Sequence, residues 1–139
     1  MSNVIRVFVE KRDGFDVEAR HMLDDLRDNL GMTAIESLRL LNRYDVEGLT
    51  PEEFERARGT VFSEPNADDV YDEIFSAGEG WRVFAMEYLP GQYDQRADSA
   101  AQCVQLLTQG ERPRVASARV VCLKGSLTDE QFLRVQQYL

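Results

Sequence analysis

The chain has 139 residues, 43% of them hydrophobic, which is enough apolar material for one folded domain and too much for a disordered chain. Its net charge of −9 gives a surface that repels phosphate backbones, so nucleic acid is not expected as a partner. No apolar run approaches the roughly 20 residues of a membrane helix, and the first residues lack a secretory signal pattern. We therefore expect a cytoplasmic protein with no membrane partner.

The first sixty residues predict a strand, a helix, a second strand and a second helix. Apolar residues recur at helical spacing after the first strand, from Ala19 to Leu30. Thr50 with Glu53 three residues later is a capping box, which predicts where the second helix begins. The predicted ranges are 4–10, 16–30, 38–46 and 51–60.

Residues 61–80 are interpreted as a linker, because Pro, Asn, Asp and Gly are frequent there. One further short strand is expected within this segment, around residues 70–74. The strand–helix–strand–helix order then returns, with predicted ranges 81–88, 95–109, 115–123 and 129–139.

The two parts share an internal repeat. Five residues of the second helix region recur 78 positions later: Leu49, Thr50, Glu52, Phe54 and Arg56 match Leu127, Thr128, Glu130, Phe132 and Arg134. The same offset carries the first helix stripe onto Ala97, Ala100, Ala101 and Val104. The strands match at offsets of 76 (Arg6 with Arg82) and 80 (Ser37 with Ser117). We expect Phe54 and Phe132 to be buried equivalently.

These observations predict an α/β (α+β) fold of tandem duplicated β-α-β-α units with pseudo-two-fold symmetry. The helices are expected to pack on an antiparallel or mixed sheet with ferredoxin-like character. Residues 1–139 form a single domain in this interpretation, with repeat halves at about 1–60 and 81–139 and the linker at 61–80.

The chain offers little for catalysis or metal binding. There is one histidine, His21, expected at the surface, and no CxxC pair, so a His/Cys metal site lacks ligands. Cys103 and Cys122 are each expected to be small buried residues. The stretches "KRDGFD" and "LPGQYD" have one glycine each, which is too few for a phosphate-cradling loop. We predict no catalytic, cofactor-binding or metal-binding residue and no bound cofactor.

One polar stretch, "LPGQYDQRADSA" from Leu89 to Ala100, remains to be explained. Pro90-Gly91 predicts a turn and Asp94 a helix cap, which leaves several polar side chains without a structural reason. The stretch is therefore either a helix start alone or a helix start that also forms a docking surface. The interface residues expected on the second interpretation are Gln92, Tyr93, Asp94, Gln95, Arg96 and Asp98.

A second set, Arg43, Tyr44 and Asp45, is expected to contribute to the same interface. It lies near the end of a predicted strand. Its plainer interpretation is a row of exposed polar residues on a strand face.

The sequence resembles a known family along essentially its whole length. The matching stretches are "VEKRDGFDVEA", "LNRYDVEGL", "FAMEYLPGQYDQRADSAAQCVQLLTQGERP" and "SARVVCLKGSLTDEQF". They look like the amino-terminal domain of the large single-chain phosphoribosylformylglycinamidine synthase. That domain is in turn similar to a dimer of the small standalone subunit of the multi-subunit enzyme.

The resemblance implies a non-catalytic assembly role in de novo purine biosynthesis. The parent enzyme is a glutamine amidotransferase and ligase that uses ATP and magnesium, and none of its catalytic motifs occurs in this chain. The implied partners are the synthetase and glutaminase domains of the same parent chain, between which ammonia must pass. The last residues lie in a helix that the family continues, so we expect a fragment of a longer protein.

Two alternatives to this interpretation remain. The first is an independent regulatory domain that binds a small molecule such as an amino acid, because tandem ferredoxin-like repeats often do so at their interface. The second is a small enzyme that uses only carboxylates.

Overall fold

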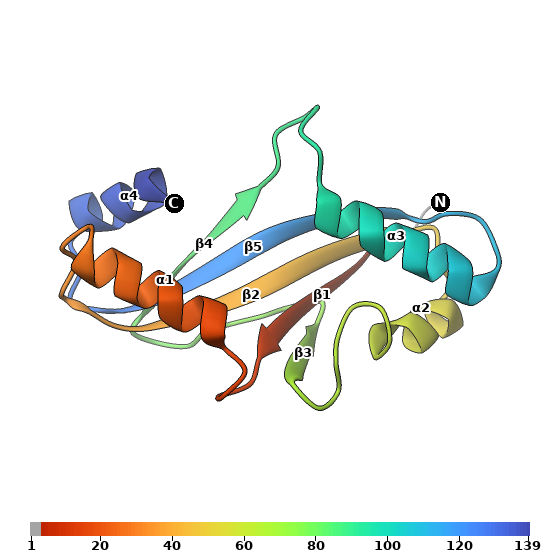
Figure 1. Cartoon of the computed structure of the whole chain (residues 1–139), viewed down its shortest axis with the longest axis horizontal. Coiled ribbons are helices and arrows are strands. Elements are labelled where there is room, and N and C mark those ends of the chain that lie inside the picture. Colours follow the sequence, from red (N-terminus) through yellow and green to blue (C-terminus); the bar gives the residue numbers. More distant parts are fainter. Residues whose placement is uncertain (1–3) are drawn as a thin grey trace.

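The computed structural model describes residues 4–139. Over these residues four helices accompany a five-stranded, fully antiparallel sheet with the order β3-β1-β2-β5-β4 (Figure 1). The elements are β1 (Val4–Lys11), α1 (Val17–Asp28), β2 (Ile35–Glu47), α2 (Pro51–Arg58), β3 (Asp68–Asp72), β4 (Trp81–Glu87), α3 (Gln95–Thr108), β5 (Arg114–Gly125) and α4 (Asp129–Tyr138).

The predicted mixture of helices and an antiparallel sheet is confirmed. Each predicted helix and strand is present, with ends shifted by at most three residues. Both capping boxes form: the backbone N–H of Glu53 donates to Thr50 Oγ1 at 3.1 Å, and that of Gln131 donates to Thr128 Oγ1 at 3.1 Å. These local signals are reliable because each cap depends on residues only three positions apart.

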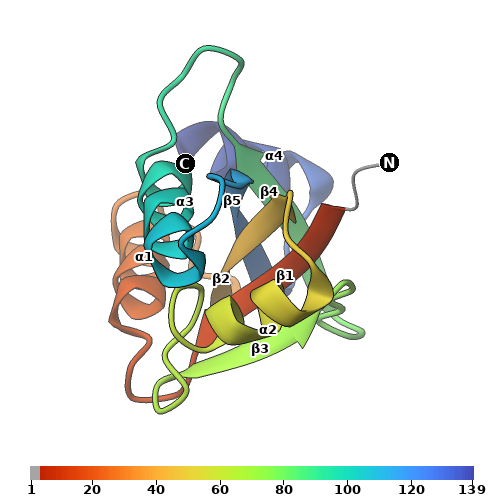
Figure 2. The same ribbon diagram turned by 90° about the vertical axis from the view of Figure 1, so that its right-hand side faces the viewer.

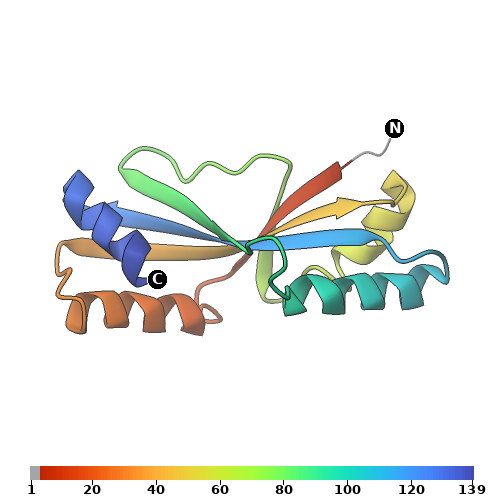
Figure 3. The ribbon, with the colours of Figure 1, turned by 90° about the horizontal axis from the view of Figure 1, so that it is seen from above.

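Helices α1 and α3 lie on the same side of the sheet, and their N-terminal ends both face its middle (Figure 3). From there α1 runs toward one end of the molecule and α3 toward the other. Helix α2 lies beside the C-terminal part of α3, and α4 beside that of α1. The loop that follows β3 crosses the opposite side of the sheet, which we call the back face.

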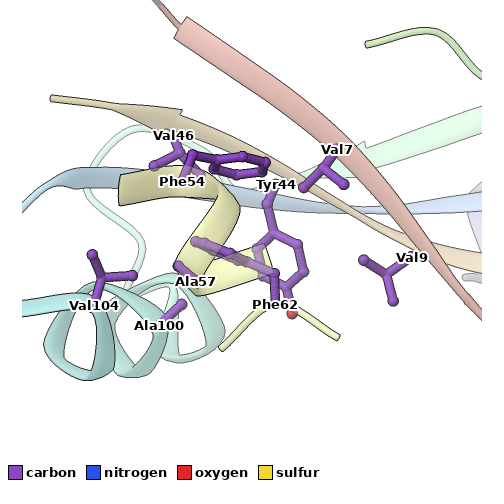
Figure 4. Close-up of a cluster of buried hydrophobic side chains, with 9 residues drawn as sticks. All are labelled: Val7, Val9, Tyr44, Val46, Phe54, Ala57, Phe62, Ala100 and Val104. Atoms are coloured by element: carbon purple, nitrogen blue, oxygen red, sulfur yellow. The ribbon is translucent and has the colours of Figure 1, made fainter. Parts of the chain in front are cut away.

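The helix-covered face of the sheet carries two separate apolar clusters. The first surrounds Phe54 of α2 and Val104 of α3, with strand residues from β1 and β2 beneath them (Figure 4). The second surrounds Leu26 of α1 and Val135 of α4, above β2, β4 and β5. In the first cluster α3, from the second half of the chain, packs on β1 and β2 from the first half. In the second cluster α1, from the first half, packs partly on β4 and β5 from the second half. Both clusters are thus shared between the halves.

The back face is covered by much less of the chain. Phe8, Leu41, Val120 and Cys122 form a small buried cluster there, covered by the loop residue Phe75 and by Trp81. Arg39 bridges this region, with its Nε donating to Glu10 Oε2 at 2.7 Å and its guanidinium 5.1 Å from the Phe75 ring centre. A loop and a charged pair therefore replace the helices on this side.

The strand pairing corrects the strand offsets expected from the sequence. Val7 and Val9 face the helices on β1, and so do Phe84 and Met86 on β4, whereas Arg6 lies on the back face. Arg6 and Arg82 are therefore on opposite faces. Residues of β1 and β4 that share a face, such as Val7 and Phe84, are an odd number of positions apart, whereas Arg6 and Arg82 are 76 apart. An offset of 77 matches faces in both strand pairs and places Asn42 directly opposite Arg119.

Two burial predictions are wrong. Phe132 is half-buried, whereas Phe54 is only 6% exposed. Cys103 is exposed, because it lies on α3 beside the buried positions Ala100 and Val104 and not on them, whereas Cys122 is buried as predicted. Part of the segment predicted as a linker enters the core, since the Phe62 ring stacks on Phe54 with centroids 5.7 Å apart.

Candidate functional site

The polar stretch before α3 is built around Asp94. Its Oδ1 accepts the backbone N–H of Ala97 at 2.9 Å, which caps the helix as predicted. The same carboxylate also accepts the Ser117 hydroxyl at 2.7 Å and the Ser117 N–H at 2.8 Å. Asp94 therefore fastens the start of α3 to the middle of β5, and its oxygens are used within the fold.

The segment between β4 and α3, residues 88–94, is an ordered protrusion that we call the β4–α3 loop (Figures 1 and 2). Gly91 has a φ of 88°, which only glycine adopts readily, so the chain reverses at Pro90-Gly91 as predicted. The Leu89 N–H donates to Gln92 Oε1 at 2.6 Å, and the Gln92 N–H donates back to the Leu89 carbonyl at 3.0 Å. These two bonds close the turn.

A second group of polar contacts holds the end of this loop. The Tyr93 hydroxyl donates to Asp98 Oδ2 at 2.8 Å, and the Asp98 carboxylate also pairs with Arg112. The hydrogen bond to Asp98 raises the pKa of Tyr93, because ionising the phenol would lose that bond and place two negative charges together. Three residues from two segments of the chain therefore stiffen the protrusion.

The same loop exposes apolar side chains to solvent. Tyr88, Leu89 and Tyr93 are 48%, 67% and 69% exposed. The alanine face of α3 is not part of this surface, since Ala97, Ala100 and Ala101 are buried against the protein's own sheet. The exposed part of the predicted interface is therefore the loop and the outer side of the first helical turn.

Gln95 and Arg96 point to a different region from Tyr93 and Asp98. They line a hollow of about 470 Å³ with Tyr88 and the exposed Cys103. Burial has the largest single effect on the pKa of Arg96 and lowers it, but the hydroxyl of Tyr44 together with the nearby Glu18 and Tyr88 raises it more, so the pKa lies above the ordinary arginine value. Arg96 remains a cation at any physiological pH.

Arg96 also lines a larger cleft of about 620 Å³ on the helix-covered face. Its floor is the middle of β1 and β2, which includes the nearly buried Val9 and Tyr44, and Phe62 also lines it. The first turn of α1 forms one wall, with Glu18 and the exposed His21. The cleft thus combines an apolar floor with charged residues at its rim.

The second predicted set is divided between the two faces of β2, with Arg43 and Asp45 paired at 3.6 Å on one face and Tyr44 on the other. Tyr44 faces the helices, where it is 6% exposed and packs edge-on against Phe62 with ring centroids 5.1 Å apart. Arg43 and Asp45 face the back, where Arg43 pairs with Glu87 at 2.8 Å and Asp45 with Arg6 at 2.6 Å. Alternation along β2 therefore places Tyr44 on the face that holds Gln95 and Arg96, and Arg43 and Asp45 on the opposite face.

Two arginines near the site were not found from the sequence. Arg112 completes the Tyr93–Asp98 group, and Arg119 pairs with Glu18 at the start of α1. The Arg119 and Glu18 positions are 101 residues apart, and no local pattern in the sequence links them.

Comparisons with protein-family models, with curated proteins and with solved structures give no match. Among residues 4–139 no cluster of three or more His, Cys, Asp or Glu side chains is arranged to hold a metal ion. Within the same range no helix is both long enough and apolar enough to cross a membrane.

Proposed function

We propose that this chain is a non-catalytic assembly domain of a phosphoribosylformylglycinamidine synthase, as its sequence resemblance implies. On this proposal it acts in the cytoplasm and contacts the synthetase and glutaminase domains of its own parent chain. ATP and magnesium belong to those neighbours, and this chain binds neither. Its contribution is to hold two reaction centres in register so that ammonia passes between them.

The observation that carries the proposal is that the β4–α3 loop is both exposed and internally braced. The polar side chains of Gln92 and Asp94 in the loop, and of Asp98 in α3, are used in hydrogen bonds within the domain. The apolar side chains of the loop, in contrast, face solvent. A stiff protrusion loses little conformational freedom on binding, and exposed tyrosines are common anchors in protein interfaces.

We further propose that the fold is a tandem duplication with a pseudo-two-fold axis and ferredoxin-like halves. The axis would pass between Asn42 and Arg119, which lie opposite each other at the centre of the β2–β5 pair. Equivalent helix positions support this relation, since Leu26 and Val104 are both fully buried and both second helices begin with a capping box. A covalent pair of like halves agrees with the resemblance to a dimer of the small subunit.

The proposal is tested in the parent enzyme by changing only exposed loop side chains. The double variant Leu89→Asp with Tyr93→Ser places polar groups where the proposed contact needs apolar ones. We expect synthesis driven by glutamine to fall about tenfold or more, with synthesis driven by free ammonia reduced less than about twofold, because a loss of 1.4 kcal/mol at the contact is a factor of ten.

Ile74→Asp is the matched control, because Ile74 is 82% exposed and lies in a different loop. It should leave both activities unchanged, since substitutions at such exposed positions usually alter stability by less than about 0.5 kcal/mol. Equal loss of both activities in the double variant, or the same loss in the control, contradicts the docking role.

A second candidate function, binding of an amino acid or a similar small molecule, is favoured by the cleft. Its volume lies within the usual range of ligand pockets, and Arg96 offers a carboxylate partner at its edge. Thermal denaturation of the isolated chain with each amino acid tests this, since a ligand at about 100 times its Kd adds roughly 2.7 kcal/mol. A shift that Arg96→Ala removes supports binding in the cleft, and no shift with any amino acid excludes it.

A further inference from the structure

The two ends of the sheet differ in how they are covered. β3 pairs with the outer edge of β1, from Val7 opposite Asp72 to Lys11 opposite Asp68. At the other end of the sheet β4 is next to β5 as β1 is next to β2, but within residues 4–139 no strand pairs with the outer edge of β4. Its outward N–H and C=O groups are therefore open to another strand.

The burial of the two strands differs accordingly. On β1, beneath its extra strand, Val7, Phe8 and Val9 are at most 9% exposed. On β4, Val83 is 47% exposed, Ala85 is exposed, and Phe84 is only half-buried. β4 thus presents apolar side chains on both faces at an open edge, which is a surface that strand addition would bury.

Within this molecule, the segment after α2 shows what covers such an edge. It places Phe62 in the core beside Phe54, then adds β3 to β1, and finally lays Phe75 on the back face. At the other end, Phe84 of β4 is only half-buried, and so is Phe132 of α4, which has the place that Phe54 has in the first half. Within residues 4–139, no segment covers the β4 end of the sheet in the way that Phe62, β3 and Phe75 cover the β1 end.

We propose that the outer edge of β4 receives a sixth antiparallel strand from the polypeptide segment that follows α4 in the parent enzyme. This inference rests on the proposed function, since it requires the domain to be part of a longer chain. By the same offset that relates the second helices, the strand would lie at about positions 146–150 of that chain. It would complete the sheet at six strands.

The chemistry of the edge defines the composition of this strand. The acidic residues of β3 pair with basic residues of its neighbours. The pairs are Asp68 with Lys11 at 3.0 Å, Asp69 with Arg12 at 3.0 Å, and Asp72 with Arg58 at 2.8 Å. The positions that correspond to these cations are Tyr88, Leu89 and Gln136, none of which is charged. The sixth strand should therefore lack the three acidic residues that β3 carries at these positions.

The experiment compares amide hydrogen exchange in β4 between the 139-residue chain and a chain lengthened by about twenty residues of the parent sequence. We expect the β4 amides that do not bond to β5 to exchange at least about tenfold more slowly in the longer chain. The amides of β1, which already has two neighbours, serve as an internal reference and should not change.

A designed extension tests the edge without depending on the parent sequence. A copy of residues 62–75 is appended after Leu139, which places its strand at positions 146–150, with Asp68→Thr, Asp69→Thr and Asp72→Thr within the copy. The matched control carries Val70→Pro in the same copy, because proline removes a backbone donor from the middle of the strand. Slower exchange in β4 with the designed extension but not with the proline control supports the proposal.

Two results would overturn it. One is unchanged exchange of the β4 amides in both lengthened chains. The other is sedimentation showing that the unmodified chain dimerises and that Val83→Lys restores the monomer, since a second copy would then occupy the edge. These readouts are separate from the glutamine and ammonia assays: slower exchange with equal losses in the two assays would reject the docking role alone.

Discussion

Asp94 and Ser117 join the first turn of α3 to β5, through two hydrogen bonds of 2.7 and 2.8 Å to one carboxylate that also caps the helix. The equivalent residue at the start of α1, Asp16, makes no side-chain cap. Two helices in similar positions are thus attached to the sheet with different strength.

Asp94→Ala should destabilise the isolated domain by about 2–4 kcal/mol, since it removes a helix cap and leaves the N–H of the buried Ser117 without its acceptor. Asp16→Ala, which removes only an exposed contact with Gly14 and a 3.4 Å ion pair with Arg20, should cost less than about 1 kcal/mol. Urea unfolding of the two variants measures the difference. Equal urea midpoints would show that the Ser117 contact contributes nothing.

Replacing Phe54 and Phe132, which the sequence repeat pairs, should have unequal effects. Phe54→Ala removes a buried ring that stacks on Phe62 and should cost about 3–5 kcal/mol. Phe132 is half-buried, edge-on to Phe84 and beneath Arg82, so Phe132→Ala should cost about 1–3 kcal/mol. Equal losses in free energy of unfolding would mean that Phe132 is as well packed in solution as Phe54.

The back-face ion pair should depend on the shape of the guanidinium and not only on its charge. Arg39 makes two hydrogen bonds to Glu10, of 2.7 and 2.6 Å, and lies over two aromatic rings. Arg39→Lys keeps the charge but loses the fork and much of the stacking, so we expect a loss of about 1–3 kcal/mol.

Arg6→Lys is the control for this change, because the Arg6–Asp45 pair has the same two-bond geometry at a more exposed position. We expect it to cost less than about 1 kcal/mol. Chemical denaturation of both variants at low and high salt compares them. An Arg6→Lys loss as large as that of Arg39→Lys would refute the importance of the aromatic surroundings.

The stability of the domain should fall at high pH because of Cys122. Burial raises the pKa of this thiol from 9.0 to about 11, and the nearby Arg39 charge reduces the effect only in part. Between these two pH values the unfolded state loses the proton while the folded state keeps it, so the free energy of unfolding should decrease by up to about 2–3 kcal/mol.

Cys122→Ala isolates this contribution, since other groups that titrate in the same range are common to both proteins. The difference between the unfolding free energies of the wild-type and variant proteins should narrow from pH 8 to pH 11. A difference that does not depend on pH would show that the thiol does not ionise on unfolding in this range.

Much of the secondary structure was predictable because its signals are local. The capping residues Thr50 and Thr128 act over three positions, and the stripe from Ala97 to Val104 over two helical turns. The strand matches missed the face-matching offset of 77, by one residue in one strand pair and by three in the other, because similar letters, such as those around Arg6 and Arg82, recur on opposite faces. A period of two makes such an error reverse every side chain, and only the pairing partners reveal it.

The candidate site was predictable in part. Asp94 as a cap and Pro90-Gly91 as a turn follow from residue chemistry, and both form. The contacts of Asp98 with Arg112 and of Glu18 with Arg119 join segments whose proximity depends on the complete sheet. The separation of Arg43 and Asp45 from the other residues depends on which face of β2 is covered, and the sequence of that strand, polar on both sides near its end, does not show this.

Each long helix packs on strands from the other half of the chain, and this affects how the chain can be divided. A cut in the loop that follows β3 would separate α1 from the β4 and β5 residues beneath it, and α3 from the β1 and β2 residues beneath it. Neither fragment would then retain a complete interior, so each should be largely unfolded alone, and mixing the two should restore the native circular dichroism spectrum. Such a pair would behave as one cooperative unit held together without a covalent link.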